Sequence, residues 1–177
     1  TMSEYVSNEM KFIELMKYCR TPFVLNAKPD DRILIVTDTD QDPLVWRALA
    51  AAGTEVGAKI TVGIMTPRVH HQANTTLPIA EAMKTSDINM YATTKAMAAS
   101  PTAMAARRAG KASSILMEEV NAHNLTSGAA TLSVDEYRAM HKFGAEVQKV
   151  WLGGTKVRVT SEFGTDLTCL VRDPKTN

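Results

Sequence analysis

The stretch Arg32-Ile33-Leu34-Ile35-Val36-Thr37-Asp38-Thr39-Asp40-Gln41-Asp42-Pro43 decides the fold of this 177-residue chain. Its first half is an apolar, β-branched run without polar alternation, which is typical of a strand covered on both faces. Asp42 offers an N-cap carboxylate and Pro43 has the φ of a first helical residue, so we expect a helix to begin there. A buried strand, an acidic turn and a capped helix predict an α/β protein.

The rest of the chain repeats this alternation. Further strands are expected at residues 59–65, 88–92 and 112–117, and further helices at 3–20, 78–84, 100–109 and 133–152. Pro22 should end the first of these helices. Right-handed crossovers would then give a three-layer, doubly wound, mostly parallel, Rossmann-like sheet.

The last two apolar segments, 156–160 and 167–171, alternate with polar residues on either side of a turn that contains Gly164. This pattern predicts a C-terminal antiparallel hairpin with one solvated face. We therefore expect an α/β domain over residues 1–154 and a closing hairpin over residues 155–177.

Composition limits the classes of partner. The net charge is +1 and the basic residues are scattered, so neither nucleic acid nor an acidic membrane is an expected partner. No apolar run approaches the roughly 20 residues that span a bilayer. Cys19 and Cys169 form no ligand-spaced motif, and two reduced thiols suit a cytoplasmic protein.

The turn after the first strand argues against a nucleotide. A dinucleotide site would need Gly-x-Gly-x-x-Gly there, so that the backbone can touch the pyrophosphate. The sequence instead places Asp38, Asp40 and Asp42 in that turn, and three carboxylates would repel a phosphate. A Walker loop is also absent from the sequence.

Candidate ligand-binding residues follow the carboxyl ends of three strands, where open α/β sheets place ligands. They are Asp38 and Asp40 after the first strand, His70 and His71 after the second, and Thr94 and Lys95 after the third. For each position an ordinary solvated turn or loop is the alternative, and Lys95 could simply extend into solvent.

Metal and nucleophile motifs are missing from the sequence. Adjacent histidines are poor partners for one metal, and His123 and His141 have no ligand-type spacing to them. The sequence has no Gly-x-Ser-x-Gly elbow, and neither cysteine has a histidine beside it. We therefore expect no metal site in this chain.

The segment Val157-Arg158-Val159-Thr160-Ser161-Glu162-Phe163-Gly164-Thr165-Asp166-Leu167-Thr168 resembles one shared by two families. They are the aminopeptidase T type metallopeptidases and the 2,5-dihydroxypyridine 5,6-dioxygenases, in which a Gly-Thr/Ser-Asp turn closes the N-terminal half of a chain about twice this long. The strand followed by Asp-Pro, and the Ser-Asp-Ile that leads into a strand, resemble both families as well.

The resemblance implies that this chain is the N-terminal domain of a metalloenzyme. Its metal, Fe(II) in the dioxygenase branch or Zn/Co in the peptidase branch, would be held by a C-terminal half that is not in the sequence. Asp38, Asp40, His70, His71, Thr94 and Lys95 would line the pocket for a small-molecule substrate, and a homodimer is the implied assembly.

The resemblance also leaves alternatives open. The dioxygenase branch carries a histidine just before a Ser-Pro pair, and here Ala99 precedes Ser100-Pro101, which puts cleavage of that particular substrate in doubt. The first interpretation is a dioxygenase domain, with an aminopeptidase domain as the second. A non-catalytic ligand-binding or docking domain is the third.

Overall fold

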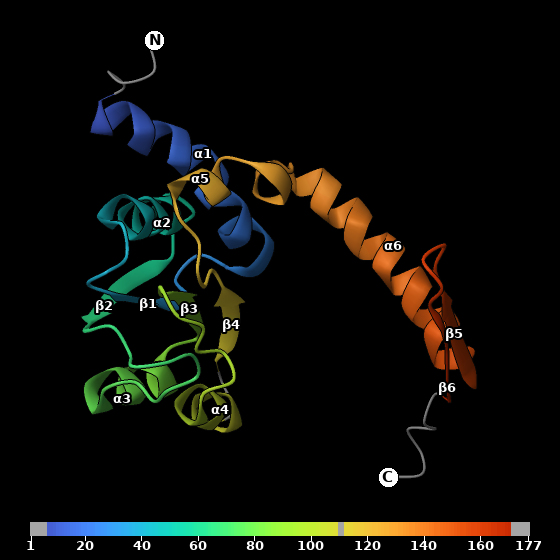
Figure 1. The fold of residues 1–177 in the computed structure, drawn as a ribbon. Coiled ribbons are helices and arrows are strands. Elements are labelled where there is room, and N and C mark those ends of the chain that lie inside the picture. The colour runs from blue at the N-terminus through green and yellow to red at the C-terminus, as the bar shows by residue number, and fades with distance from the viewer. Residues whose placement is uncertain (1–6, 110–111, 171–177) are drawn as a thin grey trace. The chain divides into compact units, whose positions relative to one another are not determined.

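Strands and helices alternate along most of the chain, as the apolar patterns predict (Figure 1). This computed structural model describes residues 7–109 and 112–170. The elements are α1 (Asn8–Asn26), β1 (Arg32–Asp38), α2 (Pro43–Glu55), β2 (Lys59–Met65), α3 (Leu77–Thr85), β3 (Ile88–Ala92), α4 (Pro101–Arg108), β4 (Ser113–Leu116), α5 (Ala122–Leu125), the 3₁₀ helix η1 (Gly128–Thr131), α6 (Val134–Gly153), β5 (Lys156–Thr160) and β6 (Asp166–Leu170).

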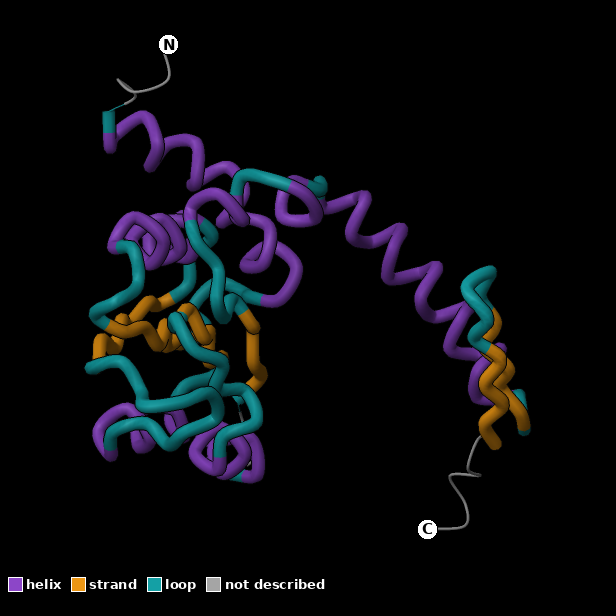
Figure 2. Tube along the Cα trace, viewed as in Figure 1, coloured by secondary structure: helices purple, strands orange, loops and turns teal. Residues whose placement is uncertain are grey.

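The first four strands form one parallel sheet in the order β2-β1-β3-β4 (Figure 2). β1 is central, and its Ile33 lies opposite Ile60 of β2 and Ile88 of β3. The expected α/β fold with a parallel sheet is therefore confirmed.

The sheet is the middle of three layers, because successive β1 side chains point to opposite faces. Ile33 and Ile35 pack in a core with α1 and α2, whereas Leu34 and Val36 pack in a second core with α3 and α4. Figure 1 shows the two helix pairs on opposite sides of the sheet. All four β1 side chains are at most 2% exposed, which is why the run carries no polar alternation.

Two helix starts follow their capping residues. The Asp42 carboxylate accepts a hydrogen bond from Leu44 N at 2.9 Å, with Pro43 as the first helical residue. Ser100 Oγ accepts from Ala103 N at 3.2 Å at the start of α4. The start expected near Ser3 for the first helix lies outside the described residues.

The prediction that Pro22 ends the first helix is wrong, because α1 continues through Pro22 to Asn26. Proline removes a helical donor, but Phe23 lies one residue further on and is fully buried. Leu15, Cys19 and Phe23 recur every four residues and pack in the same core. Burial of this stripe offsets the lost hydrogen bond and keeps the last turn helical.

The chain divides into two compact units, residues 1–134 and 135–177. The second unit contains nearly all of α6 and the antiparallel β5-β6 hairpin, which confirms the hairpin prediction. The hairpin was expected to have one solvated face, but side chains on both of its faces are exposed, with Val157 half-buried. The boundary expected between residues 154 and 155, which divides the α/β domain from the closing hairpin, stays a prediction. None of the helices in the described ranges is both long and apolar enough to cross a bilayer.

Gly53 gives a test of the packing between α1, α2 and β2. A Cβ at Gly53 would lie 2.8 Å from Phe23 Cε1 and 2.5 Å from Ile60 Cδ1. Gly53→Val should lower the free energy of unfolding by about 2 kcal/mol, because the added methyl groups must displace a buried ring. Thr54→Val, on the exposed side of the same helix, should change it by about 0.5 kcal/mol or less. Urea unfolding followed by circular dichroism measures both, and equal effects would contradict this packing.

Cys19 makes stability depend on alkaline pH. Burial raises the pKa of the Cys19 thiol to about 12, above its ordinary value near 9. Between these two values the unfolded chain binds fewer protons than the folded chain, so stability should fall as pH rises from 9 toward 12. Unfolding measured at pH 7, 9 and 10 should show a shallower loss for Cys19→Ala than for the wild type. The exposed Cys169 serves as the control, and Cys169→Ala should leave the slope unchanged.

Candidate strand-end pocket

The site is organised by the point at which the strand order reverses. The chain passes from β1 to β2 on one side and then crosses back to β3 on the other side of β1. The carboxyl ends of β1 and β3 are therefore neighbours whose following loops diverge, and open α/β sheets bind ligands in the crevice between such loops.

Asp38 ends β1 at this point and is 1% exposed. Its carboxylate accepts hydrogen bonds from Thr94 N at 2.8 Å and from Thr94 Oγ1 at 3.0 Å. It also accepts from Asp40 N at 3.2 Å, so the charge is compensated by three donors from two loops. Asp38 thus fixes the β3–α4 loop to the end of β1.

Gln41 joins the same loops to the end of β4. Its amide nitrogen donates to Ala92 O at 3.3 Å and to Val120 O at 3.1 Å, while its oxygen accepts from Asp42 N at 2.9 Å. Gln41 is 5% exposed, so these bonds satisfy a buried side chain. One glutamine therefore positions three strand-end loops.

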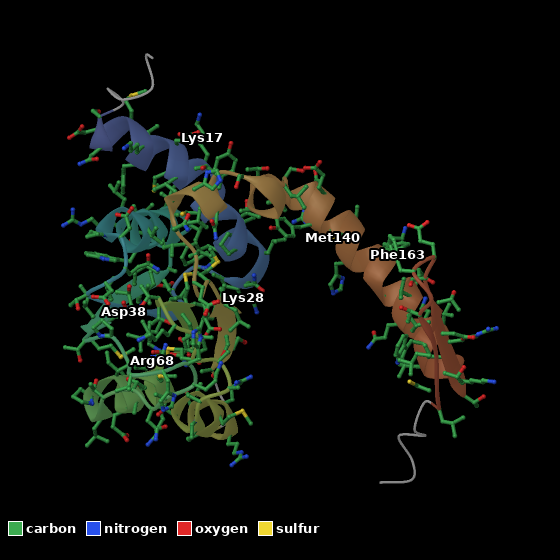
Figure 3. The ribbon with its side chains drawn as sticks, viewed as in Figure 1. Lys17, Lys28, Asp38, Arg68, Met140 and Phe163 are labelled. Atoms are coloured by element: carbon green, nitrogen blue, oxygen red, sulfur yellow. The ribbon has the colours of Figure 1, made fainter. Side chains whose placement is uncertain are left out.

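Arg68 supports the β3–α4 loop from the β2 side. Its guanidinium donates to Ala96 O at 3.1 Å, to Thr93 Oγ1 at 3.2 Å and to Lys95 O. Burial lowers the pKa of Arg68, and the charges of Asp38 and Glu118 partly oppose that effect. Asp38 and Arg68, labelled in Figure 3, are thus buried charges of opposite sign beneath one loop.

Two residues in the site have a backbone conformation that is rare outside glycine. Gln72 has φ 61° and Glu119 has φ 60°. Each turns its N–H toward the β3–α4 loop: Gln72 N donates to Ala96 O at 2.7 Å, and Glu119 N donates to Thr93 O at 2.8 Å. Such strain persists only where surrounding bonds enforce it, and it is common at functional sites.

These loops enclose an open pocket of about 430 Å³ in the first unit. It is lined mostly by residues with hydrogen-bond acceptors, including three carboxylates and a single histidine. The lining residues are Asp40, Gln41, Asp42, His71, Thr94, Glu119, Val120 and Asn121. Such a lining favours a ligand that donates hydrogen bonds or carries positive charge, and it disfavours a phosphate.

His71 contributes the one ring nitrogen of the lining. Its Nδ1 lies 2.9 Å from Glu119 Oε1 and 3.2 Å from Ala96 N. A single nitrogen can accept from the amide when it carries no proton, or donate to the carboxylate when it does. His71 Nδ1 can therefore bond either to the Ala96 amide of the β3–α4 loop or to the Glu119 carboxylate.

The sequence-predicted residues fall into three groups. Asp40, His71 and Thr94 line the pocket, and Asp38 lies beneath it bonded to Thr94. Lys95 instead donates its ammonium protons to Arg68 O at 2.7 Å and Val69 O at 3.3 Å, and His70 Nδ1 lies 2.8 Å from the exposed His71 O. Contact with a ligand stays a prediction for all six.

Sequence reasoning missed the residues after β4. Glu119 and Asn121 line the pocket, and the Glu118 carboxylate accepts from Ala98 N at 2.7 Å and from Met97 N. The signal was present, because Glu118-Glu119 follows the carboxyl end of a strand as Asp38 does. Gln41 and Arg68 also follow strand ends, but their supporting roles depend on contacts with distant loops that strand-end position does not reveal.

The donors of the pocket do not form a metal-ligand set. Within the part of the chain that the structure describes, no group of three or more His, Cys, Asp or Glu residues gathers as metal ligands would. Iron therefore does not fit the donors present among these residues.

Comparisons with known proteins point to one enzyme. A scan against protein-family models found no match, and a search of curated proteins likewise found none. Among solved structures, 2,5-dihydroxypyridine dioxygenase from Pseudomonas putida KT2440 matches 94% of this chain with a TM-score of 0.68 and 15% sequence identity. This chain resembles the N-terminal half of that dioxygenase. It spans 48% of the dioxygenase chain, and the likeness is one of fold.

The structural match confirms the resemblance that the hairpin segment suggested. It covers nearly the whole of this chain and not the hairpin alone. The pocket at the sheet edge therefore belongs to a fold that occurs as half of an oxygen-using enzyme.

Substitution of Asp38 and of Asp40 compares the loss of a buried carboxylate with the loss of an exposed one. Asp38→Asn should lower the free energy of unfolding by about 3 kcal/mol, because it replaces a buried charge that accepts from Thr94 and Asp40. Asp40→Asn makes the same chemical change on an exposed side chain and should cost about 0.5 kcal/mol or less. Urea unfolding measures both, and a small loss for Asp38→Asn would refute its role in holding the loop.

Proposed function

We propose that the first unit forms the substrate-facing wall of a metal-dependent enzyme, with the strand-end pocket as its binding surface. The reaction proposed is Fe(II)-dependent ring cleavage of a hydroxylated nitrogen heteroaromatic. The observation that carries the proposal is the match between 94% of this chain and half of 2,5-dihydroxypyridine dioxygenase. The substrate would be a small molecule, and the metal would be held by a C-terminal half.

The pocket chemistry supports a hydroxylated heteroaromatic ligand. Hydroxyl groups, and the ring N–H of a pyridone, donate hydrogen bonds. Asp40, Glu119 and Asn121 offer oxygen acceptors around the pocket, and the Thr94 hydroxyl is held in place by Asp38. Ala99 stands where the dioxygenase branch has a histidine, so the proposal names this class of substrate and not 2,5-dihydroxypyridine itself.

Iron(II), when bound, would supply dioxygen activation, and the residues of this chain would bind and orient the substrate beside it. Asp40 and Glu119 would accept its donated hydrogen bonds. Asp38, Gln41 and Arg68 would keep the loops in the arrangement that makes this possible. Asp38, Gln41 and Arg68 would contribute by positioning the loops before the substrate binds, so that the loops need not rearrange on binding.

An aminopeptidase activity is the second candidate, and the acidity of the pocket favours it. The carboxylates of Asp40 and Glu119 could pair with the ammonium group of a peptide N-terminus. Metal-activated water would then hydrolyse the first peptide bond. The ligand class separates the two candidates, because a heteroaromatic ligand is neutral and a peptide N-terminus is cationic.

Ligand binding tests the proposal on the chain itself. ¹⁵N-labelled protein is titrated separately with 2,5-dihydroxypyridine, 3-hydroxypyridine and leucinamide. The two hydroxypyridines should shift the amide signals of residues 39–42, 94 and 119–121. Asp40→Asn and Glu119→Gln should each weaken binding about tenfold, because each removes a charged acceptor. Asp30→Asn removes an exposed carboxylate that pairs with Lys59 and is the matched control.

The outcomes distinguish the candidates. Shifts at the pocket with leucinamide alone would favour the peptidase, and no shifts there with any ligand would refute the pocket as a binding surface. The reaction itself is tested by oxygen uptake and iron content in protein that includes any coding sequence downstream of Asn177. Pocket binding without turnover in that protein would leave the non-catalytic ligand-binding interpretation.

A further inference from the structure

The loop that joins β2 to α3, residues 66–76, encloses a second pocket of about 220 Å³ in the first unit. No acidic side chain of the described residues lines it. Its polar lining consists of an arginine, an amide and three hydroxyls, which belong to Thr66, Arg68, Asn74, Thr75 and Thr76. This β2–α3 pocket is therefore opposite in character to the strand-end pocket, whose lining includes three carboxylates.

Arg68 brings a buried positive charge to the wall of the β2–α3 pocket. The residue is 6% exposed, and in the described part of the chain its guanidinium forms no ion pair with a carboxylate. Asp38 and Glu118 act on Arg68 through their charge alone, without a direct bond. Buried charges in proteins are normally paired, so an anion is the expected complement of this side chain.

Hydrogen bonding leaves one of the five guanidinium donors of Arg68 unused. Nη1 donates to the carbonyl oxygens of Ala73 and Ala96. Nη2 donates to Thr93 Oγ1 and to Lys95 O. Nε is buried and has no acceptor among the described residues. A buried donor without a bond is costly, so Nε points to an acceptor that these residues do not supply.

The positive end of α3 lies at the same pocket. Thr76 is the N-cap residue of α3 and part of the lining, but its hydroxyl does not cap the helix. Within the described ranges, Leu77 N and Ile79 N have no acceptor, and Pro78 has no N–H. The first turn carries no acidic residue, and Glu81 in the next turn is held in an ion pair within the helix. The amides and dipole of α3 are therefore available to an anion.

We propose that the β2–α3 pocket binds an oxyanion, the carboxylate or phosphate group of a small molecule. Arg68 supplies the positive charge and its unused Nε–H, and the first-turn amides of α3 donate to the other oxygens. Asn74 adds a side-chain amide, because its Oδ1 already accepts from Thr102 Oγ1 at 2.9 Å and its NH₂ group faces no such demand. The pocket thus recognises negative charge spread over several oxygens.

Arginine side-chain NMR tests the contact with Arg68 directly. ¹⁵N-labelled protein is titrated with inorganic phosphate and, separately, with acetate, at an ionic strength held constant with chloride. A binding ion should shift the Arg68 Nε–Hε signal and the amide signals of Leu77 and Ile79 together, with a dissociation constant of about 1 mM or below. The ion that binds more tightly identifies the group as a phosphate or a carboxylate.

Thr76→Asp separates anion binding from stability. A carboxylate at this position caps α3 itself, so it should raise the midpoint of thermal unfolding. The same carboxylate repels an anion, so it should weaken binding at least about tenfold. Thr85→Asp makes the same substitution at the other end of α3, and it should change the dissociation constant by about twofold or less. Circular dichroism checks that both variants are folded.

Shifts at Arg68 and α3 that Thr76→Asp abolishes and Thr85→Asp preserves would support the proposal. An unchanged Arg68 Nε–Hε signal with both ions would overturn it, and so would equal weakening in the two variants, which would indicate a general effect of charge. The two pockets share no lining residue. Failure of oxyanion binding here and failure of hydroxypyridine binding at the strand-end pocket are therefore separate results.

Discussion

The buried carboxylate of Asp38 is the interaction on which the rest of the site depends. It ends the central strand at the point where the sheet order reverses, and both hydrogen-bond donors of Thr94 meet it there. A buried charge is costly unless donors surround it, so this pairing makes one loop conformation strongly preferred. Gln41 also bonds to the end of β3, but Asp38 is the residue of β1 whose side chain holds Thr94 in the β3–α4 loop.

The other polar residues of the edge extend this arrangement. Arg68 and Glu118 hold the β3–α4 loop by its carbonyls and amides, and Gln41 joins it to the loop after β4. The rare φ values of Gln72 and Glu119 are maintained by hydrogen bonds to the same loop. The outcome is a rigid, acceptor-rich surface beside an open pocket. Such a surface suits recognition of a small polar molecule, and it suits a domain whose fold occurs as half of an oxygenase.

The two units differ in how they are stabilised. The first has an apolar core on each face of its sheet, whereas residues 135–170 contain no buried side chain. Hydrophobic burial is the main favourable term in folding, so among the described residues the first unit contributes most of the burial that stabilises the fold.

Local sequence determined the elements of this protein. The apolar run of β1, the Asp42 and Ser100 caps and the alternating hairpin each specify their structure through contacts within a few residues. Strand-end position was also sufficient to bring Asp40 and Thr94 to one pocket, because parallel strands end at a common edge.

Only the tertiary structure decided which polar residues face the pocket and which support it. Lys95 folds back onto the Arg68 and Val69 carbonyls, and Glu118 caps the amides of Met97 and Ala98, over separations that no local pattern encodes. Pro22 stays helical for the same kind of reason, since Phe23 gains more from the core than the helix loses at the proline. Short-range steric and capping preferences can be read from neighbouring residues, whereas burial and long-range hydrogen bonding depend on which surfaces the completed fold brings together.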